Sequence, residues 1–125
     1  MATLLVNTGK ATVTSYLIGG APSQPKYIGW GTGAGTTAAT DTTLFTESGT
    51  TRATGTATQV TTSVTNDTLQ VVGTLTAAGT LGITNAGVFD NATVGSGNLF
   101  AKGDFSTINL NSGDSIQFTF KVQFS

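Results

Sequence analysis

Acid–base chemistry in this sequence would have to come from carboxylates. The chain contains no histidine and no cysteine, which removes the commonest general base, the usual zinc ligands and the thiol nucleophile. No two acidic residues have the spacing of a catalytic pair, and most stand beside Gly, Asn, Ser or Thr, where turn and capping roles are ordinary. We predict a protein that is not an enzyme and has no metal or cofactor; two carboxylates brought together by folding are the alternative. The acidic residues are Asp41, Glu47, Asp67, Asp90, Asp104 and Asp114.

Three local patterns could bind a small ligand, and each has an ordinary structural interpretation. The run Gly29–Gly35 departs from the dinucleotide pattern at Ala34 and Thr36, and no lysine completes a phosphate loop. The segments Asp90–Asn91 and Ser112–Asp114 lack the alternating ligands of a calcium loop. We interpret all three as turns.

Aromatic side chains offer one further binding chemistry. Tyr16, Tyr27 and Trp30 could form an exposed platform on which a sugar stacks. Aromatic residues make up only 8% of the chain, and large apolar rings are mostly buried. We therefore favour core positions for all three.

Charges are few and scattered. Charged residues are 9% of the chain and its net charge is -1, against a typical charged share of about a quarter. The basic residues are too isolated to form the patch that phosphate contacts need, so we predict no nucleic-acid partner. No apolar stretch approaches the ~20 residues of a membrane helix, and no secretory signal is recognised. A surface poor in charge repels neighbours weakly, which favours close packing against other proteins.

Alternation with a period of two residues dominates the pattern and predicts strands. It is clearest from Ser115 to the last residue, where apolar and polar side chains alternate. We expect residues 105–110 to pair with this strand as a hairpin across Asn111–Asp114. Further strands are expected in residues 60–64 and 68–76 around a turn at Asn66–Asp67, in 81–83 and in 27–30. A second hairpin is expected between residues 3–6 and 11–18. The sequence shows no useful helical pattern beyond one turn at residues 41–45, capped by Asp41.

About eight short strands with frequent turns predict an all-β fold. We expect one domain over residues 1–125, built as an antiparallel β-sandwich or a jelly-roll-like barrel with little or no helix. Residues 31–58 are rich in Gly and Thr and are expected to form a loop or arm, and residues 1–6 a contact segment. Long irregular stretches in small domains commonly make contacts.

Several segments carry a resemblance to a known class of proteins. Ile83–Asp90 has the form Ile-Thr-x-x-Gly-hydrophobic-Phe-Asp, and Gly97–Lys102, Phe105–Ile108 and the turn Ser112–Asp114 follow it. Together with Tyr27–Gly33 and Asp41–Leu44, this series resembles small structural proteins of tailed bacteriophages. These include head decoration (cement) proteins and tail or collar-fibre domains.

The resemblance implies a virion component made in the host cytoplasm. The first reading is a decoration protein on the outer surface of the head, which binds the major capsid protein and itself, commonly as a homotrimer, and stabilises the shell. A tail, collar or fibre-attachment domain and a carbohydrate- or host-binding module are the alternatives. The candidate partner contacts lie near the N-terminus and in the Thr-rich stretch: Thr3, Leu4, Leu5, Val6, Trp30, Thr32, Leu44 and Phe45.

Overall fold

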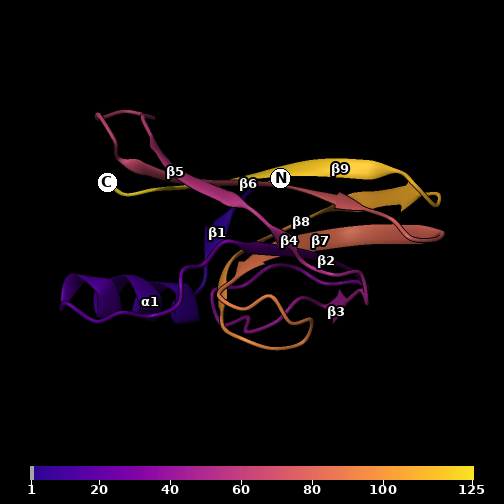
Figure 1. The fold of residues 1–125 in the computed structure, drawn as a ribbon, viewed down its shortest axis with the longest axis horizontal. Helices are drawn as coiled ribbons and strands as arrows, with labels where there is room; N and C mark the ends of the chain where they lie inside the picture. Colours follow the sequence, from indigo (N-terminus) through magenta and orange to yellow (C-terminus); the bar gives the residue numbers. More distant parts are fainter. Residues whose placement is uncertain (1) are drawn as a thin grey trace.

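The computed structural model describes residues 2–125, which form nine strands and one helix (Figure 1). In chain order these elements are β1 (Leu4–Leu5), α1 (Asn7–Leu17), β2 (Tyr27–Thr32), β3 (Thr46–Glu47), β4 (Ala53–Thr54), β5 (Thr56–Val60), β6 (Thr68–Thr76), β7 (Leu81–Phe89), β8 (Leu99–Leu110) and β9 (Ser115–Gln123).

The strands form two sheets in which every pair is antiparallel. The larger sheet has the order β1-β8-β7-β2-β3, with β4 also paired to β2, and the smaller has the order β5-β6-β9. Figure 1 shows the two sheets as stacked layers, with α1 projecting from one end. The predicted all-β antiparallel sandwich is confirmed.

Both sheets contribute to one apolar core. Trp30 of β2 lies against Phe118 of β9 with ring centroids 6.3 Å apart and the rings nearly perpendicular, so the two layers meet through aromatic side chains. The alternation seen in the C-terminal sequence places Phe118, Phe120 and Val122 in this core.

The outer face of the larger sheet is covered as well. Leu44, Phe89 and Leu99 form a second buried cluster with Val6. Leu44 belongs to residues 33–45, which contain no helix or strand. Because this segment lies over the sheet, β7 is buried on both faces from Asn85 to Phe89. The predicted arm 31–58 therefore includes a segment packed on the sheet, together with β3, β4 and parts of β2 and β5.

The predicted hairpin of residues 3–6 and 11–18 is wrong, because Asn7–Leu17 is a helix. Val13, Tyr16 and Leu17 have the i, i+3, i+4 spacing of one helix face. The signal is weak because threonine, valine and glycine are poor helix formers and no side chain caps the N-terminus. The expectation of little or no helix holds for the rest of the described chain, and residues 41–45 do not form the expected helical turn.

The predicted hairpin of residues 105–110 with the C-terminal strand is also wrong. The turn at Asn111–Asp114 exists, with Gly113 at φ 90°, but β9 pairs with β6 along its whole length, whereas β8 pairs with β7 and β1. The turn bonds to the end of β6, where the Gly113 N–H donates to the Ala77 carbonyl at 2.8 Å. It thus carries the chain from one sheet to the other.

Several strand boundaries also differ from expectation. The strand expected at residues 105–110 begins at Leu99, and the strand expected at 27–30 continues to Thr32. The strand around residues 81–83 extends to Phe89. The strand expected at 60–64 is β5, which ends at Val60, and residues 61–67 form the connection to β6.

Candidate functional site

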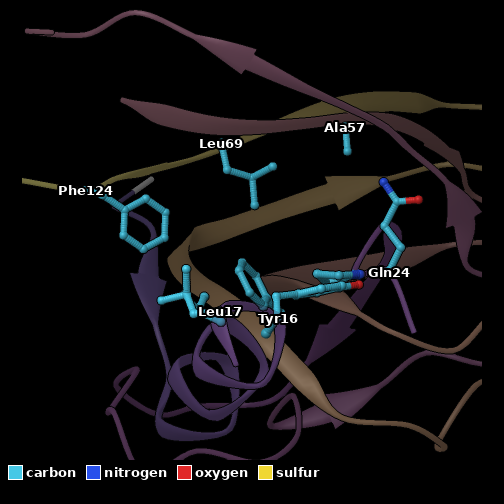
Figure 2. Close-up of a pocket in the computed structure, with 9 residues that line it drawn as sticks. Tyr16, Leu17, Gln24, Ala57, Leu69 and Phe124 are labelled. Carbon is cyan, nitrogen blue, oxygen red and sulfur yellow. The ribbon is translucent and has the colours of Figure 1, made fainter. Parts of the chain in front are cut away.

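An apolar groove of about 520 Å³ opens between α1 and the smaller sheet. In Figure 2, Tyr16 and Leu17 rise from the helix toward Leu69 of β6 and Ala57 of β5, with Phe124 and Gln24 on either side. Val13, Pro25 and Phe100 complete the lining. None of these residues is charged, so the groove suits an apolar occupant.

Exposed apolar side chains gather around this groove. Ile18, Leu17, Tyr16 and Phe124 are 86%, 80%, 43% and 46% exposed. We call these four residues the α1 end. Among the described residues, the only other large hydrophobic side chains with comparable exposure are Leu4, Val64 and Ile108. A concentration of this kind on a small protein commonly marks a surface that binds another protein.

The helix is attached to the sandwich by its first turn. The Thr8 hydroxyl donates to the Leu99 carbonyl at 2.5 Å, and the Asn7 N–H donates to the Ala39 carbonyl at 2.8 Å. Gly9 is buried so tightly that a Cβ there would overlap the carbonyl oxygen of Phe100. The helix begins against β8 for this reason, whereas its last turn, with Tyr16 and Leu17, is exposed.

A buried arginine holds two loops of the larger sheet together. Arg52 is 4% exposed, and its guanidinium makes two hydrogen bonds of 2.7 Å to the Glu47 carboxylate. It also donates to the carbonyls of Asn91 and Ser96, at 2.7 and 2.8 Å, and lies 3.6 Å from the ring centre of Phe89. The planar guanidinium suits this set of partners.

A buried lysine fastens residues 33–45 to the sheet. Lys102 of β8 is 1% exposed; its ammonium donates to Asp41 at 2.9 Å and to the Thr43 carbonyl at 3.2 Å, and it lies 3.6 Å from the ring centre of Phe45. Burial raises the pKa of Asp41, but hydrogen bonds from the Ala38 N–H and from Lys102 outweigh it and keep this pKa below its ordinary value.

Asn85 of β7 adds a second fastening for the same segment. Its side chain is fully buried; its Oδ1 accepts from the Phe45 N–H at 3.1 Å, and its Nδ2 donates to the Thr32 carbonyl at 3.2 Å. Because these buried polar groups are satisfied, the covering segment has a defined position.

Asp67 organises the connection between β5 and β6. Its carboxylate accepts backbone N–H groups from Thr62, Ser63 and Val64 at 2.8 to 3.0 Å. Hydrogen bonds from the backbone of Val64 and Thr62 lower the pKa of Asp67 far below its ordinary value. The acidic residue acts here as a turn former, as its sequence context predicts.

The predicted contact residues divide into exposed and buried ones. Thr3, Leu4 and Leu5 lie at or beside β1, the edge strand of the larger sheet, and Leu4 is exposed. Thr32 and Phe45 are half-buried and belong to the network around Asn85 and Lys102.

The other three, Val6, Trp30 and Leu44, are at most 3% exposed and offer no surface to a partner in the folded chain. Burial confirms the predicted core position of Trp30 and excludes it from an exposed platform for sugar stacking. The predicted core position of Tyr16 is wrong, because its side chain is 43% exposed. The most exposed side chains of the α1 end, Leu17, Ile18 and Phe124, were not predicted as contacts from the sequence. For Leu17, the helical spacing of Val13, Tyr16 and Leu17 was the signal in the sequence.

The acidic side chains in the described part of the chain are dispersed. Residues 2–125 contain no group of three or more His, Cys, Asp or Glu side chains that could hold a metal ion. The turn acids bond their own loops: Asp90 accepts the Asn98 N–H and Asp114 accepts the Asn111 N–H, both at 2.7 Å. Within the same residues, the one helix is too short to cross a membrane.

Comparison of the chain with protein-family models, with curated proteins and with solved structures finds no match.

Proposed function

We propose that this chain is a non-enzymatic virion protein that decorates the outside of a phage capsid shell and stabilises it. The observation that carries the proposal is the α1 end, where most of the strongly exposed large hydrophobic side chains gather beside an uncharged groove. Such a surface favours protein–protein contact over catalysis.

The fastened loops support an assembly role. Arg52 and Lys102, both buried, hold the segments around the larger sheet through ion pairs of 2.7 and 2.9 Å to partly exposed carboxylates. A surface whose shape is fixed before binding loses less conformational entropy when it meets a partner. Many bound copies would then stabilise a shell by mass action.

The contact with the shell is assigned to the edge of the larger sheet. β1 pairs with β8 on one side only, and it presents the exposed Leu4. A strand of the shell protein can add to such an edge through main-chain hydrogen bonds, while Leu4 supplies an apolar anchor.

The virion part of the proposal rests on the resemblance. Its main segment, Ile83–Asp90, covers β7 from its third residue and the residue after the strand, and Gly97–Lys102 includes the start of β8. These are buried strands at the centre of the larger sheet. The resemblance therefore concerns the scaffold, which is why the location on the particle needs an experiment.

Immunogold electron microscopy of particles from the source culture tests the location. An antibody raised against the recombinant chain should label heads evenly, and the same antibody absorbed with excess chain should label nothing. Gold confined to tails or necks would replace decoration with an attachment role. No labelling of any particle would overturn the virion assignment and direct attention to glycan binding.

A binding assay tests the edge contact. Tagged chain should sediment with heads from which the bound protein has been stripped. Leu4→Asp should reduce the bound amount by about tenfold, as expected for an apolar anchor in an interface. Thr80→Asp adds the same charge at an exposed turn between β6 and β7 and should bind normally. Equal binding by both variants would remove β1 from the interface.

A further inference from the structure

The groove at the α1 end is left open in the single chain. Val13, Tyr16 and Leu17 face it from the helix, Ala57 and Leu69 from the smaller sheet, and Figure 2 shows the space between them. A helix of 11 residues is marginal in water unless its apolar face is packed. Here the last turn lacks such packing.

The same end carries an apolar projection. Leu17 and Ile18 are the two most exposed large hydrophobic residues in the described chain, and they stand at the tip of α1. The helix stops there because Gly19 takes a φ of 84° and its N–H bonds back to the Tyr16 carbonyl at 3.0 Å. One chain therefore presents both a groove and a side-chain cluster able to fill one.

We propose that the groove is occupied by the Leu17–Ile18 tip of a second copy of this chain, in a two-fold symmetric pair. In such a pair the tip of each copy enters the groove of the other. The same surface therefore both inserts a tip and receives one. This pairing rests on the proposed function, which treats the α1 end as a surface for assembly. It adds that the partner bound by this surface is a second copy of the chain.

The exposed area matches what such a pair needs. With side chains of about 200 Å² each, the exposed fractions of 80% for Leu17, 86% for Ile18, 43% for Tyr16 and 46% for Phe124 leave roughly 500 Å² of apolar surface per chain. Complete burial of this surface on two copies would cover roughly 1,000 Å², the lower limit of a specific interface.

The charge distribution also permits two copies to meet. No charged residue lines the groove, and the net charge of the chain is -1. The groove itself therefore adds no contact between like charges when two identical surfaces pair. Because the area is at the low end, we expect a dissociation constant in the micromolar range.

The oligomeric state in solution tests the proposal without any particle. Sedimentation velocity of the full chain, up to about 100 µM, should show a monomer that converts to a dimer as concentration rises. The double variant Leu17→Asp, Ile18→Asp should stay monomeric, with an unchanged circular dichroism spectrum. Ile108→Asp is the control, because it charges an exposed apolar residue near the end of β8, away from α1 (Figure 1), and should dimerise like the original chain.

Cross-linking locates the contact and covers the case in which the double variant does not fold. Because the chain has no cysteine, Ile18→Cys introduces a single thiol, and a short bis-maleimide should give a covalent dimer. Thr80→Cys, in the turn between β6 and β7, should not.

Two results would overturn the pairing. If the original chain stays monomeric at every concentration tested, the groove does not bind a second copy. Its occupant would then be another partner, either the shell protein or a small apolar ligand. A dimer that survives the double variant would place the interface elsewhere. Immunogold labelling of heads together with a monomer in solution would overturn the pairing and leave the proposed function standing. A dimer in solution without labelling of any particle would overturn the proposed function and leave the pairing standing.

Discussion

At the scale of single residues, polar side chains bonded to backbone groups define the loops of this molecule. Three of the acids assigned to turns from their neighbours, Asp67, Asp90 and Asp114, accept backbone N–H groups within their own loops. This was predictable because the partners lie close in sequence. The ion pair of Lys102 with Asp41 was not, because 61 positions separate the two residues.

Asp67 should make the stability of the protein sensitive to acid. Its pKa is lowered in the folded state by the N–H groups of Val64 and Thr62, whereas in the unfolded chain this pKa is about 4. Between these two values the unfolded state binds more protons, so stability falls as pH decreases. The stabilisation is complete above the unfolded pKa and is lost as pH falls toward the folded one.

Denaturant midpoints at pH 7 and pH 3 should therefore differ less for Asp67→Asn than for the original chain. At pH 7 the variant should be the less stable of the two. An equal drop in midpoint for both proteins between the two pH values would show that Asp67 does not carry the linkage.

At the scale of elements, alternation predicted most strands, but turn chemistry could not predict their partners. Asn111–Asp114 was correctly assigned as a turn, yet it joins β8 and β9 of different sheets. A turn sequence fixes a reversal of the chain, and packing decides which strand lies alongside. The helix α1 was missed for a similar reason, since its position depends on the close fit of Gly9 against Phe100.

Arg52 links Glu47 to the loop that contains Asn91 and Ser96, so loss of its side chain should weaken the attachment of both segments. Arg52→Met would leave Glu47, which is 12% exposed, without its partner, and would free the carbonyls of Asn91 and Ser96. Removing one member of a buried pair costs about 3–5 kcal/mol of unfolding free energy. Urea denaturation followed by circular dichroism measures this loss.

The double variant Arg52→Met, Glu47→Gln is the matched control. It removes the uncompensated charge and should recover part of the stability that Arg52→Met loses. A double variant that loses the sum of both single losses would show that the two side chains act independently.

At the scale of the whole molecule, two sheets are joined by one apolar core of aliphatic and aromatic side chains, and the α1 end lies outside that core. The fold class was predictable because alternation and turns recur along the chain. The α1 end was not, because exposure depends on which faces the rest of the fold leaves uncovered. Stability should accordingly reside in the core, and assembly at the α1 end.

Substitutions of Trp30 test whether stability resides in the core. It is 1% exposed and meets Phe118 across the sandwich, so Trp30→Ala should lower the unfolding free energy by about 3–5 kcal/mol in one cooperative transition. Trp30→Phe should lose less, because it keeps a ring and removes an Nε1 that has no hydrogen-bond partner within the described residues. Circular dichroism is the required probe, since Trp30 is the only tryptophan of the chain.

These measurements should be made at low protein concentration. The chain is then monomeric, and pairing does not contribute to the unfolding free energy. Under those conditions Leu17→Asp should lower the unfolding free energy far less than Trp30→Ala, because the Leu17 side chain is already 80% exposed. If Trp30→Ala were as stable as the original chain, the ring would not join the sheets, and the separation between a structural core and an assembling end would fail.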